Sequence, residues 1–260
     1  MKKSHKIYAI LNMIVLAFII FWNYWVNVDG INGNTVSSLS SEYENLFTPA
    51  GYAFSIWGLI YLALFAQAIF FISRAFNPVK DSDFLSQIGP YLIMANIGNG
   101  LWLYMWLMEY TGLSVIVMLG ILCSLVIVIL NTNMERWDAP RTIIFWLWWP
   151  IAIYIGWIAV ATIANISANL AKTGWTGGAS EISWTVVMII VAVILYLFLI
   201  AARNLRESAC VGVWALVAIS VRHWNAIPEL QWTALIGAIV LFVAISYHGY
   251  KNRETAPFKL

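Results

Sequence analysis

The chain has 260 residues, of which 62% are hydrophobic and 10% are charged. Soluble domains average about 25% charged residues, so this composition cannot cover a surface that faces water, and it indicates an integral membrane protein. The net charge of +2 and the lack of a basic stripe argue against a nucleic-acid partner.

Eight apolar segments approach the roughly 20 residues that a helix needs to cross the hydrocarbon core. We therefore predict an all-α polytopic membrane protein with eight transmembrane helices. The first segment lacks a small-x-small cleavage site and is longer than a signal peptide's apolar run, so we expect a retained helix. The seventh is the weakest. The expected helices cover residues 7–27, 50–74, 88–108, 112–132, 143–168, 182–202, 209–224 and 230–250.

The basic residues predict the orientation of these helices. With the N-terminus inside, twelve Lys and Arg residues fall in cytoplasmic segments, whereas the outer loops hold only Lys172 and Arg222. This bias follows the positive-inside rule and favours an even number of helices, with both termini in the cytoplasm. The short tails and the lack of organelle signals favour a bacterial inner membrane.

The longest loop, residues 28–47, falls on the outer side and is rich in Gly, Asn and Ser. Such composition is typical of an irregular connection. A loop of this length near a membrane face is either a lid or binding loop, or a plain linker.

The central parts of the expected helices contain no Asp, Glu, Lys, Arg or His. Proton-coupled transporters normally keep an ionisable relay at mid-depth, and zinc or di-iron enzymes need clustered His and carboxylates. We therefore expect no catalytic residues, no metal site, no required cofactor and no axial haem ligand. Cys123 and Cys210 have no CxxC partner and are expected to act as small apolar residues.

The apolar segments are instead rich in tryptophan, with 15 in the chain. Several fit the interfacial belts where tryptophan is common: Trp22, Trp25, Trp175, Trp184, Trp224 and Trp232. Others lie deeper, at Trp57, Trp102, Trp106 and Trp157. Each buried indole N–H requires an acceptor. These deeper rings either line a pocket for a flat hydrophobic ligand or pack between helices.

Amides accompany the deep tryptophans. Asn96 and Asn99 precede Trp102, and Asn165 and Asn169 follow Trp157. An amide in lipid must bond to another helix or to a bound molecule. Both roles, interhelical bonding and ligand contact, are left open.

Three motifs resemble the tryptophan-rich sensory protein family, which includes the mitochondrial translocator protein. The stretch from Pro49 to Tyr61, "PAGYAFSIWGLIY", is similar to the signature of the family's second helix. "NGLW" at 99–102 is similar to the Asn-x-x-Trp of helix three. "YIGWIAVATIAN" at 154–165 is similar to the helix-five pattern.

The resemblance covers residues 7–170 and implies a five-helix bundle around a pocket. It implies tetrapyrroles such as protoporphyrin or haem, or sterol-like molecules, as ligands. Residues 1–170 would form this bundle, and residues 171–260 would add three helices of unknown role. The pocket would be lined or braced by Pro49, Tyr52, Phe54, Trp57, Tyr61, Asn99, Trp102, Tyr154, Trp157, Ala161 and Asn165.

The chain departs from the family pattern in several places. Its entrance has one proline, Tyr52 stands where Trp is frequent, and the Phe54–Trp57 spacing is one residue shorter than usual. The helix-five sterol motif is absent, because no Tyr precedes Lys172. The last three helices match no family motif and could cover a dimer face, close the pocket or add an activity.

These patterns favour a membrane-embedded binding protein for a flat hydrophobic ligand, acting as sensor, regulator or carrier. One alternative is a transporter of a neutral or amphipathic small molecule. Another is an enzyme that acts on a lipid or degrades a porphyrin under light. The expected partners are the lipid bilayer and a hydrophobic small molecule, and a homodimer is left open.

Overall fold

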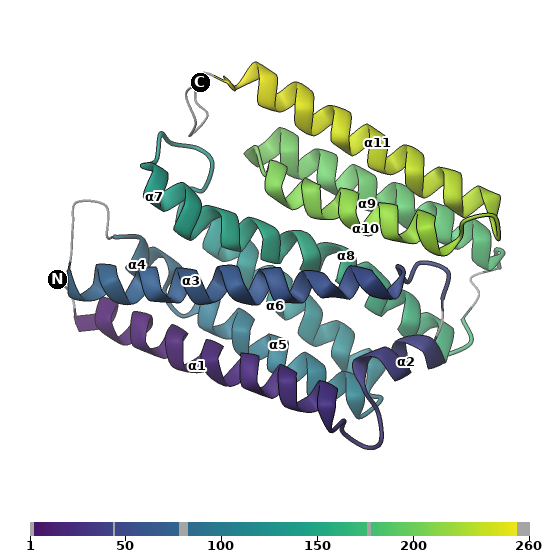
Figure 1. Cartoon of the computed structure of the whole chain (residues 1–260), viewed down its shortest axis with the longest axis horizontal. Helices are drawn as coiled ribbons and strands as arrows, with labels where there is room; N and C mark the ends of the chain where they lie inside the picture. Colours follow the sequence, from purple (N-terminus) through teal and green to yellow (C-terminus); the bar gives the residue numbers. More distant parts are fainter. Residues whose placement is uncertain (1–2, 44, 78–82, 176–177, 254–260) are drawn as a thin grey trace. The chain divides into compact units, whose positions relative to one another are not determined.

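The computed structural model describes residues 3–43, 45–77, 83–175 and 178–253. Within these ranges the chain is helical and contains no strand, apart from a single bridge between Ile31 and Asn34. The ribbon in Figure 1 shows long helices joined by short connections. The expected all-α class is confirmed.

The described helices, two of which are short 3₁₀ or π turns labelled η, follow one another as α1 (Lys3–Val28), α2 (Val36–Glu42), η1 (Gly51–Ser55), α3 (Ile56–Phe76), α4 (Phe84–Ile88), α5 (Tyr91–Leu107), α6 (Thr111–Asn131), α7 (Arg141–Ile143), η2 (Ile144–Trp148), α8 (Trp149–Lys172), α9 (Glu181–Arg203), α10 (Arg206–Arg222) and α11 (Pro228–Lys251).

Six described segments are long and apolar enough to cross a membrane: Ser4–Val28, Gly51–Phe76, Thr111–Asn131, Arg141–Lys172, Glu181–Arg203 and Pro228–Lys251. Helices α5 and α10 lie at the third and seventh expected segments, but each has only 17 residues. The polytopic membrane fold is therefore confirmed, whereas the expected count of eight spanning helices is not exact.

The chain divides into two compact units. The first comprises Met1–Leu39 and Trp57–Ile151, and the second comprises Ser40–Ile56 and Ala152–Leu260. Most of α8 therefore belongs to the same unit as α9, α10 and α11. The assignment of residues 1–170 to a five-helix bundle stays a prediction.

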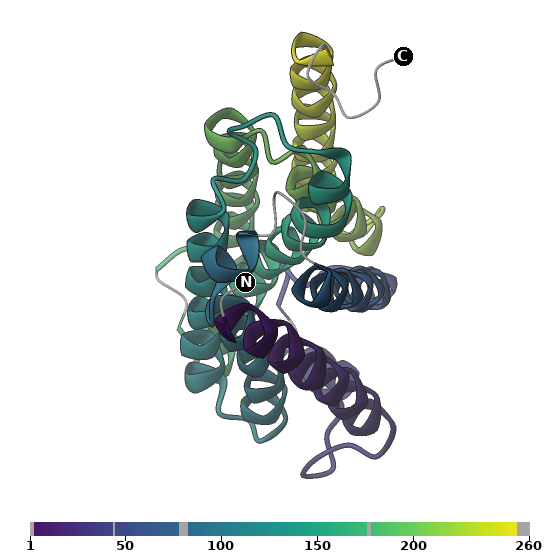
Figure 2. The ribbon, with the colours of Figure 1, turned by 90° about the vertical axis from the view of Figure 1, so that its left-hand side faces the viewer.

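In the first unit, α5 packs against α1 and α6 at two glycines. A Cβ atom added at Gly98 would lie 2.7 Å from Ile121 Cγ1, and one at Gly100 would lie 2.5 Å from Ile19 Cδ1. The Trp22 indole N–H donates to Gly100 O at 3.3 Å. Glycine is needed where helices approach this closely. Figure 2 shows this unit with the N-terminal end of α1 toward the viewer.

A π-helical turn, η2, precedes Pro150. Proline has no backbone N–H and its ring crowds the preceding turn, so the helix widens there instead of keeping regular α-helical bonds. Gln67 from α3 is buried and donates its amide N–H to Leu147 O at 3.0 Å. A side chain on a neighbouring helix thus satisfies a carbonyl in the irregular turn.

In the second unit, α8 is held closely to α9 and α10. The Ser208 hydroxyl donates to Ala152 O at 2.7 Å, and the Tyr196 hydroxyl donates to Gly156 O at 2.6 Å. Gly156 lies against the backbone of Ser208, and Gly212 lies against the ring of Tyr196. Small residues and interhelical hydrogen bonds are the usual means of joining helices in lipid.

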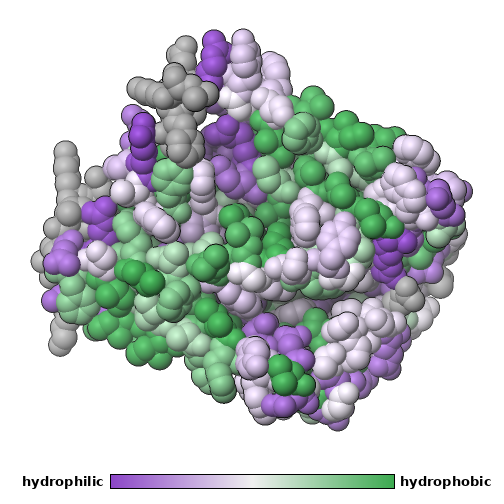
Figure 3. Space-filling model, in the orientation of Figure 1, coloured by the Kyte–Doolittle hydropathy of each residue, from purple (hydrophilic) through white to green (hydrophobic). Residues whose placement is uncertain are grey.

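The outer flanks of the helices are apolar. Phe18 of α1, Phe198 of α9 and Phe242 of α11 are each about 60% exposed. The space-filling view shows hydrophobic residues along the helix flanks, while polar residues gather near the helix ends (Figure 3). This distribution suits a protein whose flanks contact lipid and whose ends contact water.

Candidate functional site

The segment before α3, residues 46–50, is hydrogen-bonded to α10 and to His223 just after it, within the second unit. Ala50 N donates to Ala218 O at 3.2 Å, and Arg222 Nη1 donates to Thr48 O at 2.6 Å. His223 Nε2 lies 2.7 Å from Leu46 O. These contacts hold the irregular backbone on either side of the buried Pro49, and they come from a helix that the motifs do not include.

Tyr52 and Phe54 have different aromatic partners. Tyr52 makes an edge contact with Trp214 of α10, with ring centroids 5.3 Å apart, and the Trp214 N–H donates to Ala53 O at 3.1 Å. Phe54 makes an edge contact with Trp157 of α8 at 5.9 Å. Phe54 and Trp157, both expected at the pocket, therefore touch, whereas Tyr52 pairs with a tryptophan outside the expected set.

Trp157 is the most deeply placed of these rings. It is 2% exposed, and the neighbouring Tyr154 is 1% exposed. Its indole N–H is buried and finds no hydrogen-bond acceptor within the described part of the chain. A buried donor without an acceptor costs about 1–3 kcal/mol. The Trp148 N–H in the first unit is buried and lacks an acceptor among the described residues in the same way.

Ala161 and Asn165 continue the same face of α8. They follow Trp157 by four and eight residues, which places all three on one side of a helix. Asn165 is buried and Ala161 is partly exposed. The face thus combines an indole, a small residue and an amide in sequence along α8.

The remaining expected site residues lie in the first unit. Trp57 stacks on Tyr61 of the same helix with centroids 5.3 Å apart, and the Tyr61 hydroxyl donates to Asn99 Oδ1 at 3.0 Å. On α5, Trp102 stacks on Trp106 at 6.2 Å, and both are buried. The structure therefore joins Trp57, Tyr61 and Asn99 directly.

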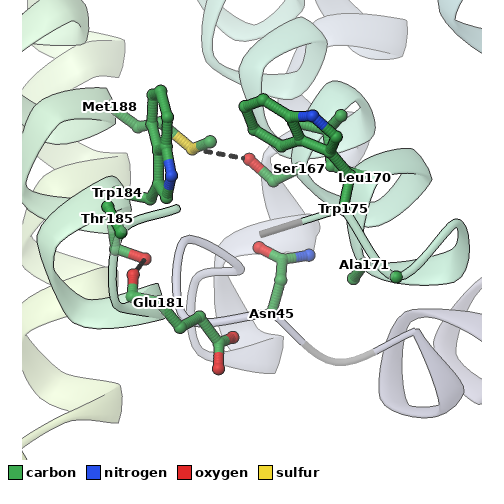
Figure 4. Close-up of a pocket in the computed structure, with 11 residues that line it drawn as sticks. Asn45, Ser167, Leu170, Ala171, Trp175, Glu181, Trp184, Thr185 and Met188 are labelled. Carbon is green, nitrogen blue, oxygen red and sulfur yellow. Dashed lines mark hydrogen bonds between the residues drawn. The ribbon is translucent and has the colours of Figure 1, made fainter. Parts of the chain in front are cut away.

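A separate cavity of about 300 Å³ lies in the second unit, where α8 ends and α9 begins. It is lined by Asn45, Ser167, Leu170, Ala171, Gly174, Trp175, Ala179, Glu181, Trp184, Thr185 and Met188. Figure 4 shows the Trp184 and Trp175 indoles on either side of the hydrogen bond between Ser167 and Met188, with Asn45 and Glu181 below them. None of the eleven expected site residues lines it.

The lining of this cavity follows a helical pattern that the sequence analysis missed. Residues 167, 170, 171 and 174 repeat at the spacing i, i+3, i+4, i+7, and so do residues 181, 184, 185 and 188. This spacing places each set of residues on one side of its helical segment. Trp175 and Trp184 also fit the interfacial belt, so the cavity was not predicted from the sequence.

The described residues offer no group of three or more His, Cys, Asp or Glu side chains that could hold a metal ion. Cys123 and Cys210 are free thiols on exposed helix flanks. The chemistry at both aromatic clusters and in the cavity is therefore that of rings, amides, hydroxyls and one carboxylate, which suits binding of an organic molecule.

A family model described as TSPO-like protein matches residues 9–247. The match runs past residue 170 and includes α9, α10 and most of α11, where the quoted motifs have no counterpart. Comparisons with curated proteins and with solved structures gave no match. The chain is thus an integral membrane protein that belongs to the TSPO-like family, the translocator family of tryptophan-rich sensory proteins.

Proposed function

We propose that this protein binds a flat hydrophobic ligand, such as protoporphyrin, at the aromatic face of α8, and that it acts as a sensor, regulator or carrier of that ligand. The observation that carries the proposal is the buried Trp157 N–H, which has no acceptor among the described residues. Tetrapyrroles combine a large apolar ring with acceptor groups at its centre and edge. One such molecule can therefore pack against the aromatic rings of this face and accept a hydrogen bond from the Trp157 N–H.

The neighbours of Trp157 support this role. Phe54 packs edge-on against it, Tyr154 is buried one turn earlier, and Asn165 is buried two turns later. Aromatic rings stack on a flat ligand with an extra stabilisation of about 0.5–1.5 kcal/mol per pair. The amide would add orientation, because a few polar groups among apolar walls set the pose of a ligand.

The cluster of Trp57, Tyr61 and Asn99 in the first unit is a second group of contacts that the family resemblance implies. The hydrogen bond from Tyr61 leaves the Asn99 side chain fixed in position. Each cluster is tested by its own variant, so the proposal for Trp157 does not depend on the result for Trp57.

The test is a titration of the purified protein in nanodiscs with protoporphyrin, followed by the absorbance of the porphyrin. Trp157→Phe keeps a buried ring but removes the N–H donor. Loss of one hydrogen bond of about 0.5–1.5 kcal/mol raises Kd roughly twofold to tenfold. Trp57→Phe is measured in parallel.

The control is Trp232→Phe, because Trp232 lies on α11 and is 53% exposed. Its Kd should equal that of the unmodified protein. Absence of saturable binding, or an equal loss of affinity in all three variants, would reject the proposed ligand site.

A transporter of a neutral or amphipathic molecule is the second candidate function. The π-helical turn before Pro150 favours it, because interrupted helices recur at substrate paths in transporters. Flux of a porphyrin or another amphipathic solute into proteoliposomes would distinguish transport from binding alone.

We further propose that the protein resides in a bacterial inner membrane with both termini in the cytoplasm. The orientation in this proposal rests on the excess of Lys and Arg in one set of loops and tails. The partners that we propose are the lipid bilayer and the hydrophobic ligand.

A further inference from the structure

We propose that the cavity between the end of α8 and the start of α9 binds the ammonium group of a small organic amine. This site is separate from the α8 face around Trp157. It does not depend on the proposed porphyrin binding, since the two share no residue.

The size of the cavity limits the ligand. Its volume of about 300 Å³ is at the lower end of the roughly 300–1,000 Å³ range of ligand pockets. A small molecule fits this space better than a tetrapyrrole does. Trp175 is 49% exposed and lines the cavity, so a ligand can enter from the end of the helices without passing through the packed interior.

The walls are suited to an apolar body that carries a positive charge. The indole rings of Trp175 and Trp184 contact each other, with centroids 5.2 Å apart and planes tilted by 48°. Leu170, Ala171 and Met188 complete the apolar lining. Tryptophan offers the most favourable ring face for an ammonium group. In Figure 4 the two indoles lie next to each other on the same side of the cavity.

The hydroxyl groups of the cavity can only accept further hydrogen bonds. Ser167 has one hydroxyl hydrogen and two protein acceptors within 2.9 Å, Ile163 O and Met188 Sδ. The Thr185 hydroxyl donates to Glu181 O at 2.9 Å. Since both hydrogens are directed to the protein, each oxygen presents lone pairs to the cavity. These two hydroxyl oxygens therefore favour a ligand group that donates hydrogen bonds.

The charged residues around the cavity also favour a ligand that donates hydrogen bonds, and in particular a cation. Glu181 lines the cavity and makes no ion pair with any described residue, and no Lys, Arg or His belongs to the lining. The nearby Lys172 ammonium lies over the Tyr43 ring, 4.8 Å from its centroid. A carboxylate in the same lining as two acceptor hydroxyls and two indoles matches an organic cation and disfavours an anion.

Asn45 connects this cavity to the segment before α3 (residues 46–50), which is hydrogen-bonded to α10. Its side-chain oxygen accepts from Phe47 N at 3.1 Å, and its backbone oxygen accepts from Arg222 Nη1 at 3.1 Å. The residue is buried, so its position is set by the protein and not by the ligand. One side of the cavity is thus preformed.

The test uses 2-phenylethylammonium as the probe and isothermal titration calorimetry of the full chain in phosphatidylglycerol nanodiscs. We expect saturable binding that is at least about fivefold weaker in Glu181→Gln, because hydrogen bonds to charged groups are the strong ones. The matched control is Glu229→Gln, since Glu229 occupies the first turn of α11 as Glu181 does in α9.

Two further titrations test whether the ligand must be charged and where its ammonium group comes from. The neutral analogue 2-phenylethanol should bind at least about fivefold more weakly than the ammonium probe, because it lacks the charge. Nanodiscs with phosphatidylethanolamine identify the source of the ammonium group. Weaker probe binding there assigns the site to a lipid headgroup, and unchanged binding assigns it to a free amine.

No saturable heat in phosphatidylglycerol, equal binding of the alcohol and the amine, or equal affinity in Glu181→Gln and Glu229→Gln would overturn the amine site. Protoporphyrin titration of Glu181→Gln should match that of the unmodified protein. A failure of porphyrin binding alone would reject the function proposed for the Trp157 face and leave the amine result intact.

Discussion

Two buried donors in the second unit differ in one respect that matters for function. The Tyr196 hydroxyl is fully buried and donates to Gly156 O at 2.6 Å, so its requirement is met inside the protein. The Trp157 N–H is equally buried and has no acceptor among the described residues. The first residue therefore contributes to stability, and the second is the candidate for ligand contact.

Tyr196→Phe should lower the free energy of unfolding by about 1–2 kcal/mol, because it removes a buried hydrogen bond without changing the shape of the ring. Thermal unfolding in detergent, followed by circular dichroism, measures this change. Tyr247→Phe is the matched control, since Tyr247 is 67% exposed. Equal stability of the two variants would show that the bond to Gly156 O contributes nothing.

At the scale of helices, the sequence pattern identified helical faces but not their partners. The spacing of Trp157, Ala161 and Asn165 places these residues on one side of α8. It does not predict that Tyr52 meets Trp214, because α10 carries none of the family motifs. Which faces meet depends on side-chain shape across helices, and no local pattern contains that information.

The sequence pattern also does not show which glycines lie at close contacts between helices. Gly156 and Gly120 both occur inside apolar helices, and only the structure separates their roles. A Cβ at Gly156 would lie 2.8 Å from Ser208 O and 2.9 Å from Ser208 Cα, whereas one at Gly120 would meet nothing within 4 Å. One glycine permits the contact between α8 and α10, and the other faces open space.

Gly156→Ala should therefore destabilise the protein by about 1–3 kcal/mol, as overpacking against a backbone does. Gly120→Ala should leave stability unchanged or raise it by up to about 1 kcal/mol, because alanine favours the helix. Chemical unfolding of both variants in the same detergent measures the difference. Destabilisation of both to the same degree would contradict the close approach at Gly156.

At the scale of the whole molecule, composition predicted the membrane class and the all-α fold, and the motifs predicted the family. The helix count was less accurate, since α5 and α10 have only 17 residues each. The cavity at the α8–α9 turn was missed, because Trp175 and Trp184 also fit an interfacial belt. Tryptophan serves both roles at a membrane surface, so residue type alone could not distinguish them.

The orientation of the chain is predicted by its basic loops and can be measured directly. In a background where Cys123 and Cys210 are replaced by alanine, Thr173→Cys should react with a membrane-impermeant maleimide in intact cells. Asp138→Cys should react only after permeabilisation, because positive-inside bias places its loop in the cytoplasm. The opposite labelling pattern would reverse the proposed topology.

The most direct test of the account is the protoporphyrin Kd of Trp157→Phe measured against that of Trp148→Phe. Trp148 is also 2% exposed, and its N–H likewise has no acceptor in the described ranges, but it lies outside the proposed ligand face. We predict a rise in Kd of roughly twofold to tenfold for Trp157→Phe and no change for Trp148→Phe. Equal values for the two variants would show that the Trp157 N–H does not contact the ligand.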